Sequence, residues 1–452
     1  MRAPATGLGR ADRDLLLALL EMPTAGPLEE NAGRPVQLWE AQGAYAEAAA
    51  AVGFTVVRHS AADPALVTGA QVPLAVREAA ADPGFLACQP SLLLRLGPEL
   101  PRERTVMFNV HLDTVAGLGE VGFDGERFTG RGAIDAKGPA VALLAGIRAA
   151  LETVPGLGTR IGVLIQAVAG EEGGAMGVFG TKPLVEAGHV GRLNVFCEPT
   201  GRRVLARSTA AMTAWIRVDG RDAIDDDPGR GHNASVLLGF LAQHLAETLS
   251  PQSADGQVCI GGLHTGTMHN KVYGTGHLAL NLSYATPRSA QLLETALAEA
   301  LATGLDTFTR RFADSRDFRV TAAEAAGIVR LEWRKRGLPA LAEGEPWAAE
   351  LLTEGAGLSR WPTAEPSFTC DAIWLEGVPG ASAVIYGPGD LGRNNAHAAG
   401  EFAELDELEG FARDVVGILA AFGRDREPSG PSHASETVTS ADAPNPPQRE
   451  LP

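Results

Sequence analysis

The sequence predicts an α/β protein in which a mostly parallel mixed sheet is flanked by helices, with a smaller α+β region inserted. Apolar, strand-like runs alternate with helical stretches in the first half of the chain, which is typical of a parallel sheet. Beyond about residue 203 the strands become half-buried, with alternating apolar and polar faces. At 452 residues the chain also exceeds the length that one hydrophobic core usually supports, so two domains are expected.

The N-terminal segments are expected to cover one face of the sheet. A first helix is predicted over LLLALLEMP, and a second over the Ala-rich stretch from Pro35 to Gly53, where a glycine ends the helix before the strand FTVVRH. The alternation continues with the strand TVMFNV, the helix AVALLAGIRAALETV opened by Pro139, the strand RIGVLIQAVA, the helical GTKPLVEAG and the strand RLNVFCE. We expect these strands to pair mainly in parallel.

The inserted region is predicted to run from residue 205 to residue 337 as strand, helix, two strands, helix and strand. It begins with MTAWIRVDG and ends with IVRLEWRKR. The main domain therefore has two parts, residues 1–204 and 338–424, and closes with the strand ASAVIYGPG and a long helix. Residues 425–452 are rich in Pro, Ser and Ala without apolar periodicity, so a disordered tail is expected there.

Composition narrows the choice of partners. Lys and Arg total 38 and Asp and Glu total 55, and the net charge of −17 disfavours nucleic acid and anionic membranes and favours small molecules. The apolar run at residues 15–20 is too short to span a membrane, and nothing marks the chain for export. The four cysteines are widely separated, which indicates free thiols in a reducing cytoplasm.

Acidic and imidazole residues come just after several of the strand-like runs. Because ligands bind beyond the carboxyl ends of the strands in an open α/β sheet, we expect these side chains to converge. They are His111, Asp135, the pair Glu171 and Glu172, Glu198, and His397.

Each of these residues taken alone also has a simpler structural interpretation. A histidine near an aspartate, such as His111 and Asp113, is as often a structural hydrogen-bonded pair, and Asp135 alone would most simply cap the following helix. Their combination favours a metal site, in which the carboxylate of Asp113 orients a metal-bound His111. The glycines around Asp135 would bend the backbone so that its carboxylate turns inward.

The adjacent carboxylates of Glu171 and Glu172 repel each other unless a cation lies nearby. One of them can bind a metal while the other remains free to take a proton from water that the metal activates. A bridging carboxylate, with a carboxylate and a histidine on each side, supplies the ligands that zinc accepts, and cobalt or manganese could occupy the same site. The pattern therefore predicts two cations, with zinc as the first choice.

The motifs HLDT, GRGAIDAKGP, AGEEGG, CEPTG and GPG…AH…GE follow one another in the chain. From about Asp12 to Gly423 the sequence resembles the dinuclear zinc amidohydrolases that include acetylornithine deacetylase, succinyl-diaminopimelate desuccinylase, aminoacylase and the carboxypeptidase G type. The resemblance implies that His111 and Glu198 hold one metal, that Glu172 and His397 hold the other, and that Asp135 bridges them. It also implies that Glu171 is the general base and then the acid, and that the insertion is a lid and dimerisation domain.

The lid departs from the pattern of that family. Ile224 stands where the family has a histidine that stabilises the oxyanion in the partner subunit's site, and Ser283 or Tyr284 stands where it has an arginine for the substrate carboxylate. The sequence offers His232, or His269 beside Asn270, in place of the histidine, and Arg393 in place of the arginine.

The predicted function is metal-dependent hydrolysis of an amide bond in a small N-acyl amino acid or a related acylated amine. A metallo-dipeptidase or carboxypeptidase is the alternative for the same residues. The altered lid residues leave a third interpretation open, a non-catalytic, metal-binding member of the family. The resemblance implies a homodimer through the lid, and an exposed edge strand there could pair across a two-fold axis.

Overall fold

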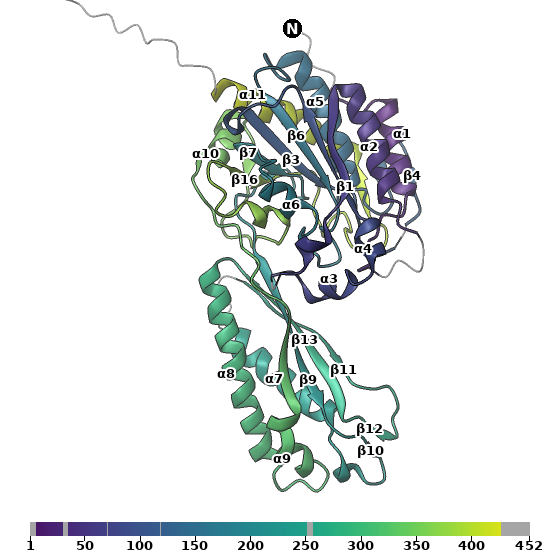
Figure 1. Cartoon of the computed structure of the whole chain (residues 1–452), viewed down its shortest axis with the longest axis vertical. Coiled ribbons are helices and arrows are strands. Elements are labelled where there is room, and N and C mark those ends of the chain that lie inside the picture. The colour runs from purple at the N-terminus through teal and green to yellow at the C-terminus, as the bar shows by residue number, and fades with distance from the viewer. Residues whose placement is uncertain (1–5, 30–34, 70, 118, 251–255, 426–452) are drawn as a thin grey trace, which may run out of the picture.

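The computed structural model describes residues 6–29, 35–69, 71–117, 119–250 and 256–425. This part of the chain forms a main body around a six-stranded mixed sheet and an elongated body around a four-stranded antiparallel sheet, seen one above the other in Figure 1. The predicted fold class is confirmed. The tail predicted from residue 425 lies outside the described residues apart from Asp425, and the domain boundaries at residues 204 and 337 stay a prediction.

The main sheet is parallel at its centre and antiparallel at one edge. Its strands, in order across the sheet, are β1 (Phe54–Ala61), β2 (Pro90–Leu96), β6 (Gly162–Val168), β3 (Thr105–His111), β7 (Leu193–Phe196) and β16 (Ser382–Ile385). The last four pair in parallel, whereas β2 runs antiparallel to both of its neighbours. β3 is buried along its whole length, as expected for a strand that is covered on both faces.

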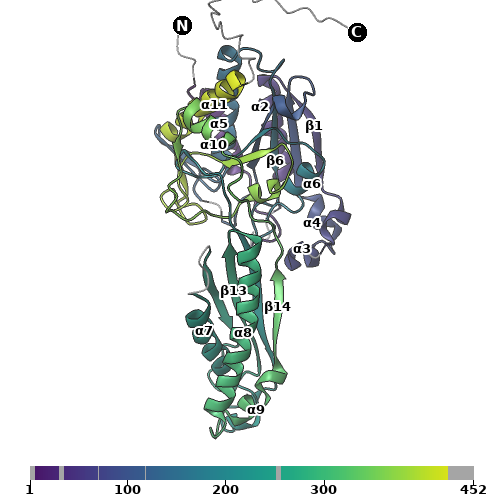
Figure 2. The same ribbon diagram turned by 90° about the vertical axis from the view of Figure 1, so that its left-hand side faces the viewer.

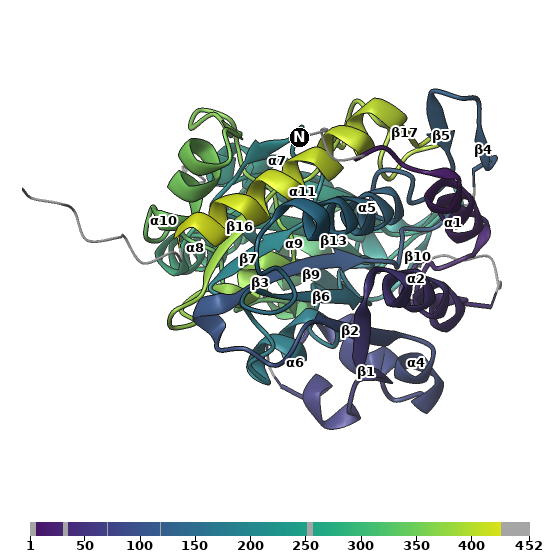
Figure 3. The same ribbon diagram turned by 90° about the horizontal axis from the view of Figure 1, so that it is seen from above.

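Helices cover both faces of this sheet. On one face lie α1 (Arg10–Glu21), α2 (Leu38–Val52), α5 (Lys137–Thr153) and α11 (Leu405–Asp425), and α6 (Thr181–Glu186) lies on the other (Figure 3). α2 ends at Gly53, whose φ of 109° is the left-handed cap conformation that glycine adopts readily. Of the helices in the described ranges, none combines the length and the apolar character needed to cross a bilayer.

Short elements complete the main body. They are η1 (Pro64–Val67), α3 (Leu74–Ala79), α4 (Pro83–Ala87), η2 (Arg102–Arg104), β4 (Gly122–Phe123), β5 (Arg127–Thr129), β8 (Arg203–Val204), α10 (Trp347–Glu350), η5 (Leu351–Gly355), β15 (Ser359–Arg360), η6 (Asp371–Leu375) and β17 (Phe402–Glu404).

The inserted body, which we call the lid, has helices on one face of its sheet (Figure 2). The strand order is β11 (Val258–His264), β13 (Thr275–Tyr284), β9 (Ala210–Asp219) and β14 (Val329–Lys335), and the helices are α7 (Ala234–Leu249), α8 (Pro287–Phe312) and α9 (Arg319–Ile328). Alternate residues of β9 are buried in the same cluster as α7 and α8, which explains its alternating pattern. α9, η3 (Pro228–Arg230) and the short pair β10 (Ala223–Ile224) and β12 (Lys271–Val272) add to the predicted order.

The lid meets the main body beside the loop that follows β6. Met176 from this loop and Ile373 from η6 both belong to the hydrophobic cluster of the lid. The indole N–H of Trp374 donates to the carbonyl of Met176 at 2.7 Å. The loop that carries Glu171 and Glu172 is therefore packed against the base of the lid.

Candidate active site

The elements that carry the predicted ligands end at one edge of the main sheet. His111 is the last residue of β3, the pair Glu171 and Glu172 follows β6, Glu198 follows β7, and His397 lies in the loop after β16. These strands are parallel neighbours, so the segments beyond their carboxyl ends lie together. Asp135 comes just before α5.

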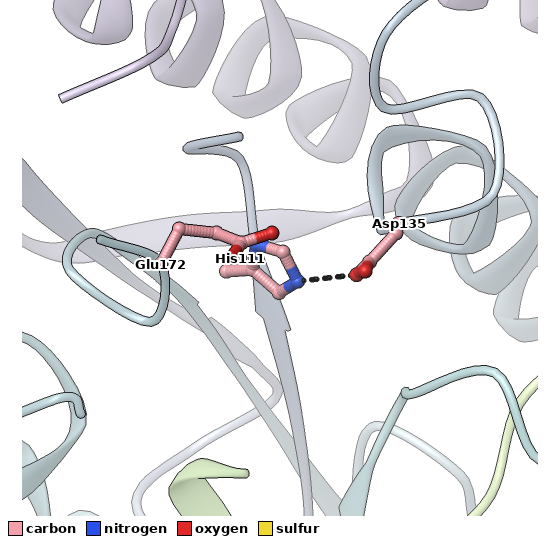
Figure 4. Close-up of side chains that lie close together, drawn as sticks. All are labelled: His111, Asp135 and Glu172. Atoms are coloured by element: carbon pink, nitrogen blue, oxygen red, sulfur yellow. Dashed lines mark hydrogen bonds and ion pairs between the residues drawn. The ribbon is translucent and has the colours of Figure 1, made fainter. Parts of the chain in front are cut away.

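Asp135 lies between the two histidines. One oxygen, Oδ1, is 2.9 Å from His111 Nε2, and the other, Oδ2, is 3.1 Å from His397 Nε2. Each histidine also approaches a glutamate: His397 Nε2 is 2.9 Å from Glu172 Oε1, and His111 Nε2 is 4.0 Å from Glu198 Oε1. Figure 4 shows His111, Asp135 and Glu172 pointing toward one another from three separate segments.

These donor atoms fit divalent cations. His111, Asp135 and Glu172 each offer a ligand atom, and the three atoms lie within 4.8 Å of one another. The side chains of Asp135, Glu172 and Glu198 are 6%, 8% and 7% exposed. Gathering buried carboxylates is costly unless a positive charge compensates them, and carboxylate oxygen with imidazole nitrogen is a ligand set that zinc accepts.

The electrostatics of these side chains indicate the same demand for positive charge. Burial raises the pKa of Glu198 to about 8, so this carboxyl holds a proton near neutrality. Hydrogen bonds to Asp135 and Glu172 raise the pKa of His397 to about 10. Burial alone would raise the pKa of Asp135, but hydrogen bonds from the two histidines outweigh it and lower that pKa. Bound cations would take the place of the protons that otherwise neutralise this cluster.

Glu171 lies beside this cluster without joining its hydrogen bonds. Burial and the negative charges of Glu198 and Glu172 raise the pKa of Glu171 well above its usual value. Within the described residues its carboxylate has no hydrogen-bond partner. A carboxyl group in this position can accept and return a proton near neutral pH.

Asp113 contacts His111 differently from the sequence expectation. The Nδ1 atom of His111 is 2.9 Å from the main-chain carbonyl oxygen of Asp113, whereas the nearest carboxylate oxygen is 3.8 Å away. The carboxylate instead accepts hydrogen bonds from the backbone N–H groups of Gly170 and Glu172, at 3.0 and 3.1 Å. Asp113 thus orients His111 through its backbone and holds the start of the loop with Glu171 and Glu172 through its side chain.

Asp371 is a second buried acid at this loop, and it was not predicted. It is fully buried, one carboxylate oxygen accepts a hydrogen bond from the hydroxyl of Thr181, and the other oxygen has no partner in the described structure. Burial raises the pKa of Asp371 to about 7. A Cβ atom on Gly177 would come within 2.4 Å of this carboxylate, so Asp371 packs directly on the loop. The segment FTCDA resembles no turn or ligand motif that would have identified Asp371 in advance.

The lid and surface residues proposed as substitutes lie outside the cluster. Arg393 forms an ion pair with Glu407, so its charge is already matched. His232 is buried, accepts a hydrogen bond from the backbone of Arg221 at 2.7 Å, and lies 3.2 Å from Glu324.

His269 and Asn270 are exposed and precede β12, at the end of the lid that lies away from the main sheet (Figure 1). At the two positions expected for an arginine, the Tyr284 hydroxyl donates to Leu338 and the Ser283 hydroxyl accepts from Gln257. Neither Ser283 nor Tyr284 carries a positive charge, so neither replaces the expected arginine.

Solved structures with the same fold cover almost the whole chain. The aminopeptidase PepT from Bacillus cereus has a TM-score of 0.63 and 17% identity and covers 92% of this chain and 100% of its own. A tripeptidase from Staphylococcus aureus has a TM-score of 0.64 and 16% identity and covers 93% and 100%. At these identities the similarity concerns the fold.

Sequence similarity is closer to a protein from Aeropyrum pernix named as a putative LysW-lysine/LysW-ornithine hydrolase. The two are 32% identical over 178 residues, which make up 39% of this chain and 47% of that protein, so the match spans about half of the relative's length. A sequence profile described as Peptidase family M20/M25/M40 matches residues 107–420, which include every predicted ligand. The chain therefore belongs to Peptidase family M20/M25/M40.

Proposed function

We propose that this protein hydrolyses the amide bond of a small N-acyl amino acid or related acylated amine with the help of two divalent cations, zinc first among them. The observation that carries the proposal is the position of Asp135 between His111 and His397, each of which also approaches a different glutamate. His111 and Glu198 would hold one cation, Glu172 and His397 the other, and Asp135 would bridge them.

The chain's own residues then have distinct roles. When bound, the cations supply Lewis-acid polarisation of the substrate carbonyl and make water more acidic. Glu171 removes a proton from the attacking water and delivers it to the nitrogen of the leaving amine. Asp113 fixes His111 by its carbonyl and the Glu171 loop by its carboxylate. Burial of His111, Asp135 and Glu198 excludes bulk water from their charges.

The similarity to a LysW-lysine/LysW-ornithine hydrolase supports a substrate in which an amino acid is joined to an acyl partner. A dipeptide or C-terminal peptide bond is the second candidate, which the family's description as peptidases favours. The non-catalytic interpretation is less well supported, because all ligand types and the unpartnered Glu171 are retained. A cytoplasmic location and a homodimer stay predictions. The four cysteines are free thiols in the structure, as the sequence predicts.

Glu171→Gln tests the proposal directly. The variant should bind zinc as the wild type does and lose at least about 10²-fold in kcat, because the general base is removed while the ligands remain. Turnover of a panel of N-acyl amino acids and dipeptides, together with metal content, measures both. The control is Glu186→Gln in α6, an exposed acid that pairs with Lys182. Full turnover by Glu171→Gln would contradict the assignment, and zinc binding by a wild type that hydrolyses nothing would favour the non-catalytic interpretation.

A further inference from the structure

A buried carboxylate outside the ligand set, Glu401, binds the backbone of the turn that carries Asp135. Glu401 is 3% exposed. Its Oε1 atom accepts hydrogen bonds from the N–H groups of Ile134 and Asp135, at 3.1 and 3.2 Å, and its Oε2 atom accepts one from Gly132 at 3.1 Å. A single carboxylate thus satisfies three backbone donors over four residues, including the donor of Asp135 itself.

The same carboxylate is paired with Arg131, which reaches the segment of His397. Arg131 Nη1 donates to Glu401 Oε2 at 2.6 Å, and Nη2 donates to the carbonyl of Ala398, the residue after His397, at 2.9 Å. The two side chains are 8% and 2% exposed, so the pair is shielded from water. The planar guanidinium therefore spans from the Glu401 carboxylate to the His397 loop.

The His397 loop needs such support because its backbone is strained. His397 and Asn395 have φ values of 62° and 54°, in the left-handed region that non-glycine residues rarely occupy. Such conformations persist only where surrounding contacts offset their cost. The Arg131 bond to Ala398 is one of these contacts, and the backbone bond from Gly130 to the carbonyl of Glu401, at 3.1 Å, is another.

We propose that Glu401, acting with Arg131, is a positioning residue that sets the separation of Asp135 and His397. This inference rests on the proposed metal site. Glu401 touches neither cation nor substrate and acts through the two ligands that would share one cation with Glu172. The other cation would depend on it less, since His111 and Glu198 are held by β3 and the end of β7. Loss of Glu401 should therefore weaken one cation site more than the other.

Glu401→Gln in the full-length protein tests the inference. The amide keeps the size of the side chain but loses the charge that Arg131 faces and turns an NH₂ group toward backbone N–H donors. Stepwise zinc titration of chelator-treated protein by calorimetry should show one of the two sites losing about 10- to 100-fold in affinity, as is typical when a partner behind a ligand is removed, and the other site changing less. With saturating zinc, kcat should fall while KM changes little.

Glu404→Gln is the matched control. Glu404 lies three residues further on and pairs with Arg127 at 3.3 Å across the neighbouring β5–β17 pairing, but both side chains are more than 40% exposed. This variant should leave both zinc affinities unchanged. If Glu401→Gln does not fold, Arg131→Lys provides the test, because it keeps a positive charge but cannot reach both Glu401 and Ala398.

Several outcomes would overturn the inference. The first is a Glu401→Gln variant that binds zinc at both sites with wild-type affinity. The second is an equal loss of zinc affinity at both sites together with a lower melting temperature, which would indicate a general structural role. A wild-type chain that binds no zinc would instead contradict the proposed function. The two failures are therefore distinguishable.

Discussion

Glu198 shows most clearly that burying these carboxylates without a cation costs free energy. Its folded pKa of about 8 exceeds the ordinary value of 4.5 because of burial, so the folded state retains a proton that the unfolded chain releases. The stabilisation from this group is fully present below about pH 4.5 and is lost as the pH rises through about 8. Asp371, with a pKa raised by burial to about 7, acts in the same direction.

The free energy of unfolding of the chelator-treated protein should therefore be lower at about pH 7.5 than at about pH 5.5. A single group with a raised pKa, such as Glu198, contributes about 1–3 kcal/mol to this difference. Denaturant unfolding at both pH values measures this, and Glu198→Gln should flatten the difference. In saturating zinc the free energy of unfolding should instead rise with pH over this range, because protons compete with the cation for the same ligands. A metal-free protein whose stability rises over this range would contradict these assignments.

The proposed ligands could be picked out from the sequence because most of them follow a recognisable strand end, whereas the supporting residues could not. Arg393 stood close to His397 in the sequence, but Glu407 on the next helix already pairs with it. Likewise, Glu324 approaches His232 from a helix 92 residues away. Contacts of this kind depend on tertiary packing, which no local pattern reports. The same holds for Glu401, which follows His397 closely in the sequence but accepts a hydrogen bond from the backbone of Asp135, 266 residues earlier.

At the scale of elements, hydrophobic periodicity in the sequence predicted the presence of long helices and buried strands better than it predicted the residues at which they begin and end. The helix after Asp135 was expected to open near Pro139, but α5 begins at Lys137, where the tertiary structure holds the turn. β2 was not predicted, although PSLLLRL is a strand-like run, because two short helices precede it without a clear pattern. The extra helix α9 in the lid was also missed. Short amphipathic segments carry too little periodic signal to be separated from loops.

Two glycines inside helices should respond oppositely to the same substitution. A Cβ on Gly146 of α5 would lie 2.7 Å from Ala412 O and 2.8 Å from Val415 Cβ of α11, which packs alongside (Figure 3). Gly146→Ala should therefore destabilise the protein by about 1–3 kcal/mol. Gly43 of α2 has nothing within 4 Å of such a Cβ, so Gly43→Ala should stabilise it by about 0.5–1 kcal/mol. Denaturant unfolding that shifts both variants in the same direction would contradict this packing.

For the whole molecule, the lid extends away from the main body and leaves the edge strand β11 on its outer side (Figure 1). The opposite edge, β14, is tied to the main body by Arg334, whose Nη2 lies 3.0 Å from Glu78. β11 also carries Leu263, which is 41% exposed. Within the described residues no further strand pairs with this edge, and an apolar edge of this kind favours pairing with a second copy.

Analytical ultracentrifugation should accordingly give a dimer of the 47.1 kDa chain. Leu263→Lys should shift the equilibrium toward monomer, because a buried charge opposes strand pairing. Leu151→Lys, at a residue of the main body that is 36% exposed, is the control and should leave the dimer intact. A wild-type monomer at all concentrations would exclude this assembly.

The proposed function depends above all on cations beside Asp135, and anomalous scattering from crystals grown with zinc tests this most directly. Two anomalous peaks are expected, one between Asp135, His111 and Glu198 and one between Asp135, Glu172 and His397. Crystals of Asp135→Asn should lose at least one of them. Zinc that binds only elsewhere on the chain, with no peak beside Asp135, would contradict the account.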